Sequence, residues 1–286
     1  MPKSRLDSTA VVTVTYNSGA YLRHFLQSVR ASEPESVHIV VADNGSTDVD
    51  EARRYCGEFQ ATFFELGKNL GYGGAINAAV NTLPESITSV LISNPDIELR
   101  LGSLSSMVDT LSARPDAGSV GPCVLNSDGS IYPSARRLPS LRTGIGHALF
   151  AHVWKNNPWT TRYLSDAVQP ETTRSAGWLS GSCLLVRRSA FDALGGFDKA
   201  FFMYFEDVDL GYRLGKSGWL NLYLPAAVVT HTGAHSTSTD SSRMLQVHHQ
   251  SAYLYLARKY RGWYLAPVRA GLRAALHVRA WWMTRR

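Results

Sequence analysis

Three carboxylates in four positions follow a run of apolar and aromatic residues in the second half of the chain. The run spans 201–205, and the acids are Glu206, Asp207 and Asp209. Aromatic side chains exclude water and adjacent carboxylates repel, so the pKa of at least one acid should rise toward that of a general base. The alternative is a helix amino terminus, where acids satisfy free N–H groups. Asp209 and Arg213 are spaced as a structural i,i+4 ion pair, which leaves Glu206 and Asp207 for chemistry.

Two further acids and a histidine follow apolar runs that predict strands. Asp43 precedes Asn-Gly-Ser, and is either a helix cap or an acceptor for the ring N–H of a nucleotide base. Asp96 follows Asn94-Pro95, where the proline ends the strand. Its carboxylate is either a solvated turn residue or a ligand of a divalent ion that bridges phosphates. His231 closes an apolar run, and is either a packed histidine or a second metal ligand.

Two glycine-containing segments predict a close approach to a ligand. In the segment 69–77, the third glycine of a dinucleotide fingerprint would fall where Ile76 stands, so that interpretation fails. Its glycines instead allow a helix start to lie near a ligand or the sheet. In the second segment, Trp178, Ser180 and Gly181 precede an apolar run and form either a tight turn or a platform for a sugar ring.

The first hundred residues alternate between strand and helix patterns. The predicted strands are 10–15, 37–42, 61–66 and 89–93, and the predicted helices begin near residues 21, 48 and 71. This alternation predicts a parallel sheet with crossover helices. Ligands of such sheets bind beyond the carboxyl ends of the strands, where the polar residues of this chain collect.

The second half of the chain is less regular. A long active-site loop is predicted over 134–176 because that segment is basic and contains proline and aromatic residues. The other predicted elements are strands at 118–125, 182–187, 219–224 and 228–232, and helices at 208–216 and 245–259.

The composition is that of one α/β domain with an extension. The chain has 286 residues, of which 44% are hydrophobic. Its three cysteines (Cys56, Cys123 and Cys183) are far apart, which argues against a disulfide framework or a zinc site and fits a reducing cytosol. We expect no signal peptide, because residues 1–9 lack an apolar segment, and no apolar run long enough to span a membrane.

The carboxyl-terminal tail carries the positive charge. From Arg243 onward there are nine Lys or Arg residues and no acid, so the net charge of +6 less these nine leaves −3 for residues 1–242. We therefore expect a domain over 1–242 and a basic helical extension over 243–286. Residues 263–283 predict an amphipathic helix interrupted early by Pro267, with Arg269, Arg273 and His277 on one face and Leu265, Val268, Leu272 and Leu276 on another.

Two interpretations of this tail remain open. Basic residues with tryptophans near both ends predict a helix in a lipid interface, and an ordinary terminal helix packed on the domain is the alternative. Nucleic acid also attracts basic tails, but the sequence contains no groove-reading motif, so we expect no nucleic-acid partner.

Taken in order, these motifs resemble the inverting family-2 glycosyltransferases of the GT-A fold. The resemblance covers roughly residues 9–240 and is strongest to bacterial rhamnosyltransferases acting on N-acetylglucosaminyl-diphospho-polyprenol. The segments that carry it are 15–17, 43–48, 69–77, 94–96, 178–182, 206–207 and His231. The fold class implied is α/β, with a Rossmann-like, mostly parallel sheet flanked by helices and a carboxyl-terminal amphipathic helical extension.

The resemblance also implies roles for individual residues. The donor nucleotide would be held by Thr15, Asn17, Asp43, Asn69, Gly71 and Asn94. Asp96 and His231 would bind Mg²⁺ or Mn²⁺, and Asp207 would be the base that deprotonates the acceptor hydroxyl. Trp178, Ser180, Gly181 and Glu206 would shape the sugar and acceptor pockets. One position departs from the family pattern, because Asn94 replaces the usual first Asp of its DxD motif and one carboxylate is lost.

The expected function is transfer of a sugar, L-rhamnose from dTDP-rhamnose, to a polyprenyl-diphosphate-linked acceptor in cell-wall or polysaccharide synthesis. The enzyme would be cytoplasmic and peripheral on the inner face of the cell membrane, which it would contact through 263–286, and a homodimer is left open. Alternatives are a galactofuranosyl or N-acetylhexosaminyl donor, a sugar-1-phosphate nucleotidyltransferase, or a non-catalytic domain that binds lipid-linked sugars. A nucleotidyltransferase would carry a basic, glycine-rich loop where this chain has 16–19.

Overall fold

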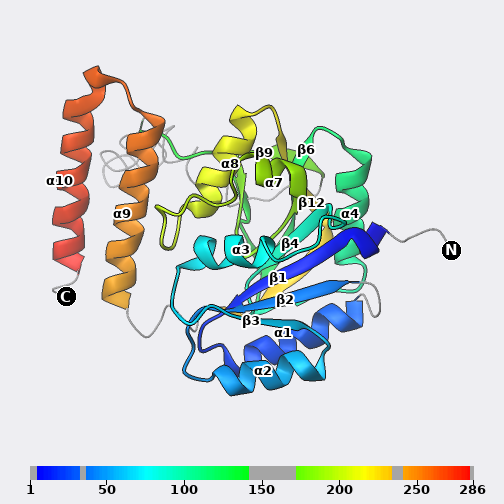
Figure 1. The fold of residues 1–286 in the computed structure, drawn as a ribbon. Helices are drawn as coiled ribbons and strands as arrows, with labels where there is room; N and C mark the ends of the chain where they lie inside the picture. Colours follow the sequence, from blue (N-terminus) through cyan, green and yellow to red (C-terminus); the bar gives the residue numbers. More distant parts are fainter. Residues whose placement is uncertain (1–4, 33–36, 142–171, 234–240, 284–286) are drawn as a thin grey trace.

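The computed structural model describes residues 5–32, 37–141, 172–233 and 241–283, and shows a curved sheet with helices on both faces and two further helices at one end (Figure 1). The chain begins with a short 3-10 helix, Arg5–Ser8. The predicted His277 lies in the last part of the chain, where no side chain is described, and most of the predicted loop 134–176 lies outside the described residues.

The first half of the sheet is parallel, as the alternating pattern predicts. In space its strands follow the order β3-β2-β1-β4. The strands are β1 (Thr9–Thr15), β2 (His38–Asp43), β3 (Thr62–Glu65) and β4 (Ser89–Ser93), and the helices between them are α1 (Gly19–Ser32), α2 (Val49–Glu58) and α3 (Tyr72–Val80). The carboxyl ends of all four strands therefore lie along one edge.

Beyond β4 the sheet becomes mixed. The next strand in space is β11 (Cys183–Arg187), which runs antiparallel to β4 and to β6 (Ala117–Asn126). β12 (Leu220–His231) is parallel to β6. β5 (Ile97–Leu99) forms the edge of the sheet and pairs antiparallel with β12. The two strands predicted at 219–224 and 228–232 are thus one strand, whose register shifts between Leu224 and Val228.

The remaining elements cover the sheet and frame its edge. Short strands are β7 (Ile131–Tyr132), β8 (Ala135–Arg136), β9 (Arg174–Ala176) and β10 (Trp178–Leu179), and helices are α4 (Ser103–Ala113), α7 (Arg188–Ala193) and α8 (Glu206–Lys216). β8 and β10 form a separate antiparallel pair. Neither α4, α7 nor β5 was predicted from the sequence.

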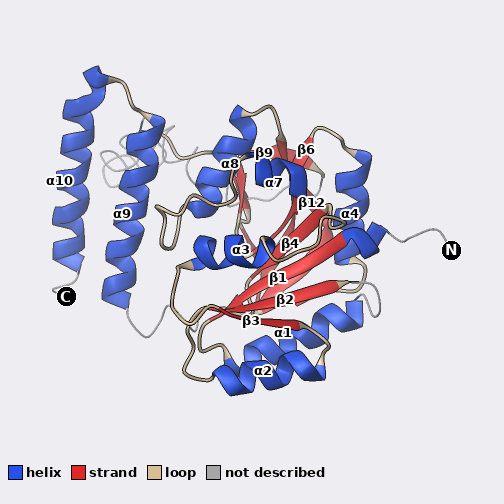
Figure 2. Cartoon of the chain, viewed as in Figure 1, coloured by secondary structure: helices blue, strands red, loops and turns tan. Residues whose placement is uncertain are grey.

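The sheet is buried on both faces, which explains the uninterrupted apolar strands. Val11 of β1 belongs to one hydrophobic cluster with side chains of α1, α2 and α4, whereas Ala10 and Val12 belong to another with those of α3, α7 and α8. Figure 2 shows α1 and α2 on one side of β1 and α3 on the other. Cys56, Cys123 and Cys183 are buried and free, which confirms that none forms a disulfide.

Two long helices form the carboxyl-terminal extension. α9 (Ser241–Lys259) and α10 (Ala266–Met283) lie side by side and are joined by a short 3-10 helix, Trp263–Leu265 (Figure 1). Pro267 does not interrupt α10, because it occupies the first turn, where its missing N–H has no intrahelical acceptor. In the described part of the chain, no helix is long and apolar enough to cross a bilayer.

Candidate active site

The ends of β1 and β2 enclose buried acceptor atoms. Thr15 and Asp43 are register partners, and both side chains are almost wholly inaccessible to solvent. One oxygen of Asp43 (Oδ2) accepts hydrogen bonds from the backbone N–H groups of Gly45 and Ser46, at 3.1 and 3.2 Å. The other oxygen, Oδ1, and the Thr15 hydroxyl are buried without a partner among the described residues. An orphaned buried acceptor is costly, so this corner is suited to a ligand that brings an N–H group.

Three asparagines hold the loops around this corner. Asn17 accepts hydrogen bonds from the backbone N–H (2.7 Å) and the hydroxyl (3.0 Å) of Thr47. Asn44 donates to the side-chain oxygen of Asn69 at 3.1 Å, and the same oxygen accepts from Gly71 N–H at 2.9 Å. The side-chain oxygens of Asn17 and Asn69 are therefore used in loop-to-loop contacts.

Gly71 brings the start of α3 against the loop that precedes α8. Its φ is +74°, and a Cβ at this position would lie 2.1 Å from the carbonyl oxygen of Phe202. The next residue, Tyr72, donates its backbone N–H to the same oxygen at 3.1 Å. No side chain larger than hydrogen fits there, which gives a physical reason for the glycine.

Asp96 and His231 form a pair on the same edge of the sheet. Asp96 Oδ1 lies 3.1 Å from His231 Nε2, and both side chains are largely buried. Strand pairing fixes this contact, because β5, which follows Asp96, pairs with the end of β12. Asn94 lies beside them and donates its backbone N–H to the carbonyl oxygen of Ser182 at 2.9 Å.

The pair fits a divalent ion that also binds phosphate oxygens. Asp96 Oδ1 and His231 Nε2 are hydrogen-bonded at 3.1 Å, and a carboxylate and an imidazole that face one another are groups that a divalent ion can share. Among the described residues, no group of three His, Cys, Asp or Glu side chains surrounds a common point. An ion held here would therefore need oxygens from its substrate to complete its coordination.

Asp207 lies in the first turn of α8 and faces the Gly181 turn. Its Oδ2 accepts the Gly181 N–H at 2.9 Å and its Oδ1 accepts the Val208 N–H at 2.8 Å. A Cβ on Gly181 would lie 3.3 Å from Asp207 Cβ, so the small residue permits this approach. Burial raises the pKa of Asp207, and the two backbone hydrogen bonds and the charge of Arg136 lower it. Asp207 therefore accepts N–H groups as a helix-terminus acid does, and the raised pKa is compatible with the predicted role as a base.

Glu206 is the more strongly perturbed acid. Burial first, and then the charge of Asp207, raise its pKa from 4.5 to about 8. Its Oε2 is buried without a partner in the part of the chain that the structure describes. At neutral pH this carboxyl is therefore mainly protonated, and can donate a hydrogen bond beside the Asp207 carboxylate.

Asp209 has the structural role that its spacing predicts. Arg213 Nε donates to its Oδ2 at 2.6 Å. The same guanidinium also donates to the carbonyl groups of Leu194 and Gly196, so the pair anchors α8 to the preceding loop.

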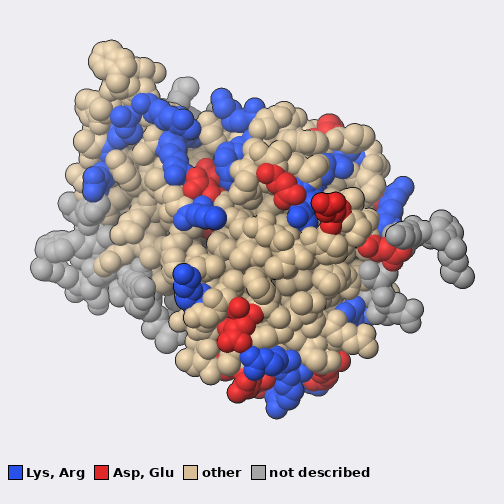
Figure 3. Space-filling view, viewed as in Figure 1, with Lys and Arg blue, Asp and Glu red and all other residues tan. Residues whose placement is uncertain are grey.

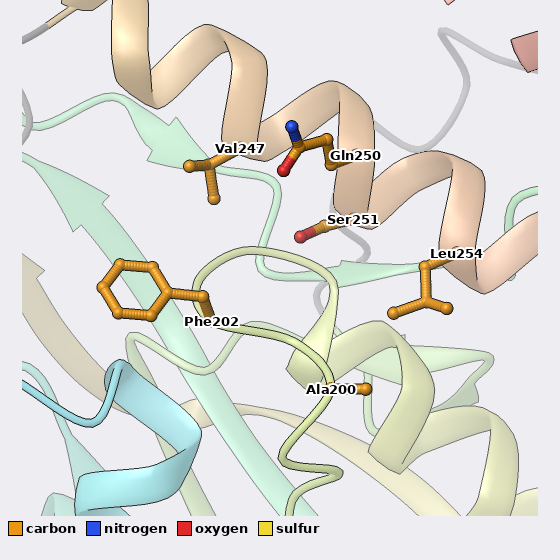
Figure 4. Close-up of a pocket in the computed structure, with 6 residues that line it drawn as sticks. All are labelled: Ala200, Phe202, Val247, Gln250, Ser251 and Leu254. Carbon is orange, nitrogen blue, oxygen red and sulfur yellow. The ribbon is translucent and has the colours of Figure 1, made fainter.

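α9 supports the loop that leads into α8. Tyr204 and Phe205 both adopt φ of 66°, a left-handed conformation that is strained for aromatic residues. Ser251 of α9 donates to the Met203 carbonyl at 2.9 Å, and the His248 ring lies edge-on to both aromatic rings, with centroids 5.4 Å apart. A pocket of about 280 Å³ lies between loop and helix (Figure 4). Its lining residues are Ala200, Phe202, Val247, Gln250, Ser251 and Leu254.

Tyr72 lies among the predicted site residues, although the sequence did not single it out. Its hydroxyl donates to the Gly181 carbonyl at 2.7 Å. Its pKa is raised well above the ordinary value, first by burial and then by the charges of Glu206 and Asp207. The preceding residue, Gly71, is hydrogen-bonded to Asn44 and Asn69. The only feature of the sequence that could have indicated Tyr72 as a site residue is its place in the glycine-rich segment 69–77.

The remaining predicted residues, Trp178 and Ser180, lie in the segment that leads into the Gly181 turn. Trp178 donates its indole N–H to the Arg137 carbonyl at 3.0 Å. The hydroxyl groups of Ser180 and Ser182 lie 3.0 Å apart and are buried. The predicted residues are thus brought to one edge of the sheet, near the place where β11 pairs antiparallel with β4.

A parallel half-sheet joined to a mixed half, with acids at the strand ends of one edge, is the arrangement of a GT-A glycosyltransferase. Residues 10–195 match Glycosyl transferase family 2, and the chain belongs to this family. It is therefore a glycosyltransferase.

Relatives and solved structures agree with this assignment. The chain is 44% identical to the N-acetylglucosaminyl-diphospho-decaprenol L-rhamnosyltransferase of Mycobacterium tuberculosis (strain CDC 1551 / Oshkosh), over 98% of this chain and 94% of the relative. It is 28% identical to the rhamnosyltransferase WbbL of Escherichia coli (strain K12), over 87% of this chain and 92% of that protein. The mannosyltransferase PcManGT from Pyrobaculum calidifontis, solved with GDP-Man and Mn²⁺, superposes with a TM-score of 0.62 at 18% identity, covering 96% of this chain and 71% of that one.

Proposed function

We propose that this enzyme transfers L-rhamnose from dTDP-rhamnose to N-acetylglucosaminyl-diphospho-polyprenol, with inversion at the anomeric carbon. The observation that carries the proposal is the 44% identity over 98% of this chain with a relative named for this sugar and this kind of acceptor. The Escherichia coli relative, also named a rhamnosyltransferase, supports the sugar.

The donor nucleotide would occupy the corner formed by β1 and β2. Asp43 Oδ1 would accept the ring N–H of the pyrimidine, and the Thr15 hydroxyl lies beside it; both atoms are buried without a partner among the described residues. Asn17, Asn69 and Gly71 would act mainly by fixing the loops around the nucleotide, because the oxygens of both asparagines accept hydrogen bonds from loop residues.

Asp96 and His231 would hold Mg²⁺ or Mn²⁺ together with the donor diphosphate, and Asn94 would lie next to that diphosphate. Such an ion supplies positive charge to the leaving diphosphate. Asn94 removes one carboxylate from the usual pair, so the ion would depend on Asp96 and on substrate oxygens. The 3.1 Å separation of the two side chains supports this assignment.

Asp207 would accept the proton of the attacking hydroxyl. The acceptor oxygen then forms a bond to the anomeric carbon from the face opposite the diphosphate, the bond to the diphosphate breaks, and its electron pair leaves with that group. Burial raises the pKa of Asp207 and so favours proton uptake. Glu206, Trp178, Ser180 and Gly181 would line the sugar and acceptor pocket around this base.

The test is transfer from a panel of nucleotide sugars to a short-chain N-acetylglucosaminyl-diphospho-lipid. dTDP-rhamnose should be the preferred donor, and UDP-galactofuranose and UDP-N-acetylhexosamines should react poorly. Asp207→Asn should keep the fold and lose at least about 10²-fold in kcat. Asp109→Asn is the matched control, because Asp109 is an exposed acid paired with Arg5 away from the site. Preference for another donor would refute the sugar assignment, and normal turnover by Asp207→Asn would refute the base.

The lipid-linked acceptor requires contact with a membrane, and we place that contact at the tip of the α9–α10 pair. α10 does not offer its whole apolar face, because Leu272 and Leu276 are half-buried. Arg269, predicted on the opposite face, is half-buried as well. Trp263 and Tyr264 at the tip are strongly exposed. Lys and Arg side chains gather just below the tip (Figure 3). An aromatic tip above basic residues suits an anionic leaflet, here the cytoplasmic one.

A further inference from the structure

Arg136 is held rigidly at the edge of the site by two aromatic rings. It lies on β8, directly opposite Trp178 of β10. Its guanidinium carbon is 5.7 Å from the centroid of the Trp178 ring and 5.4 Å from that of Tyr132. Its Nε–H donates to the Pro133 carbonyl at 2.6 Å. The planar group is therefore fixed in position before any ligand arrives.

The charge of Arg136 is not neutralised within the described part of the chain. The Nε–H bond uses one of the five N–H donors that a guanidinium carries. No carboxylate among the described residues forms an ion pair with this half-buried side chain, whereas Arg213 and Arg258 are paired with Asp209 and Asp198. Its remaining N–H groups are not among the buried atoms that lack a partner, so they reach solvent and are available to an anion.

The position of Arg136 connects the two reactive parts of the site. On one side, its charge lowers the pKa of Asp207, yet both oxygens of Asp207 accept backbone N–H groups instead of pairing with it. On the other side, the Tyr132 ring that carries the guanidinium lies edge-on to His231, with centroids 6.5 Å apart. The cation therefore acts on the charge of Asp207 and is linked to the Asp96–His231 pair through the Tyr132 ring.

We propose that Arg136, held by Tyr132 and Trp178, is a diphosphate-binding site. The planar fork of a guanidinium matches two phosphate oxygens. The inference rests on the proposed function, in which two diphosphates approach this edge. One is the leaving group of the donor, which gains an electron pair when the anomeric bond breaks. The other joins the acceptor sugar to its lipid. The chemistry of recognition is the same for both.

The first experiment measures anion binding without rhamnose or acceptor. Inorganic pyrophosphate is titrated calorimetrically, in EDTA, into wild type, Arg136→Gln, Arg136→Lys and Arg114→Gln. Arg114 is the control because its exposed guanidinium pairs with Asp116 on the surface. We expect at least about ten-fold weaker binding for Arg136→Gln, partial recovery for the lysine variant, and no change for the control. Thymidine binding should be unchanged in all four proteins, which a collapsed site would not allow.

Equal pyrophosphate affinity in wild type and Arg136→Gln, or no binding by wild type, would overturn the proposal even if rhamnosyl transfer is established. Conversely, loss of pyrophosphate binding in Arg136→Gln would support the anion site even if the donor sugar is another one. The two hypotheses therefore fail independently.

Steady-state kinetics then identifies which diphosphate is bound. If it is the leaving group, Arg136→Gln should lower kcat by about 10²-fold and weaken inhibition by dTDP by a similar factor. If it is that of the acceptor, KM for the lipid diphosphate should rise, and an alkyl N-acetylglucosaminide without the diphosphate should show no such change. Unchanged kcat and KM for all substrates would contradict both versions.

Discussion

Replacing Glu206 with glutamine should abolish a pH-dependent loss of stability. Burial and the charge of Asp207 raise the pKa of Glu206 from 4.5 to about 8. Between these values the unfolded chain has released a proton that the folded protein still holds. Because the unfolded state binds fewer protons, the free energy of unfolding falls as the pH rises through this range, and is flat below and above it.

The magnitude follows from the size of the shift. Each pKa unit corresponds to about 1.4 kcal/mol, so a shift of roughly 3.5 units gives on the order of 5 kcal/mol at full ionisation. The side chain is only 6% exposed, so solvent screens this value little. Glutamine has nearly the same shape and no proton to lose. The variant should therefore resemble wild type near pH 5 and become several kcal/mol more stable than wild type above pH 8.

Urea unfolding followed by tryptophan fluorescence, at half-unit steps from pH 5 to pH 9, measures this difference. Asp207 is present in both proteins, so its own titration largely cancels in the comparison. Glu85→Gln is the control, because Glu85 is exposed, and its stability curve should follow that of wild type at every pH. A constant difference between Glu206→Gln and wild type from pH 5 to pH 9 would refute a carboxyl that stays protonated in the folded state.

Three other predictions concern the loop, the ion and the tip. Gly71→Ala should destabilise the protein by more than about 2 kcal/mol, because its Cβ would lie 2.1 Å from the Phe202 carbonyl oxygen. Gly67→Ala, at a similar positive φ but in open space, should cost only about 1 kcal/mol; equal urea midpoints would contradict the clash. Asp96→Asn should raise the Mn²⁺ concentration needed for half-maximal activity at least about ten-fold, and an unchanged metal titration would remove it from the ion site. Trp263→Ser should weaken sedimentation with anionic liposomes while leaving transfer to a water-soluble acceptor intact; undiminished sedimentation would exclude the tip as the contact.

Much of the first half of the fold could be predicted from the sequence. β1, β2 and β4 are apolar runs buried on both faces, and such runs have few alternatives to a central strand. Once those strands are parallel, Asp43 and Asp96 must follow strand ends at the same edge. The conclusion required only local patterns and one topological rule.

α4 has the helical spacing of apolar residues, but the polar residues between them obscure this pattern in the sequence. Leu104, Met107, Val108 and Leu111 have helical spacing and are buried. The serines and threonine between them favour turns, since their side chains compete for backbone groups. In the structure they bond to carbonyls three or four residues back within the helix, as Ser106 does to Gly102 and Thr110 to Ser106.

The arrangement of the strands beyond β4 could not be predicted because their contacts are remote in sequence. The strand at 182–187 was expected, but its insertion between β4 and β6 depends on pairs such as Cys183 with Ser93. The proximity of Arg136 to Asp207 has the same origin: it requires the β8–β10 pair, which places Arg136 opposite Trp178. Nothing in the basic segment that contains Arg136 distinguishes it from its neighbour Arg137.

α9 lies almost wholly in the predicted basic extension, and it contacts the loop that precedes Asp207. In this loop Tyr204 and Phe205 are both left-handed, at a cost of about 1–3 kcal/mol each. Such a conformation persists only where surrounding contacts determine it. Those contacts come largely from α9, since Ser251 fixes the Met203 carbonyl and Tyr255 packs on Phe205, with ring centroids 5.8 Å apart.

α9 is consequently packed against the loop that precedes Asp207, although its net charge resembles that of the extension. α10 is tied to the end of α9, because Arg269 donates to the carbonyl groups of Tyr260 and Gly262. A tip anchored in a leaflet would thus be connected through packed helices to the loop that orients Asp207. We infer that two parts of the basic extension have different roles. α9 stabilises the strained loop, and the tip before α10 would bring that loop to the membrane surface that carries a lipid-linked acceptor.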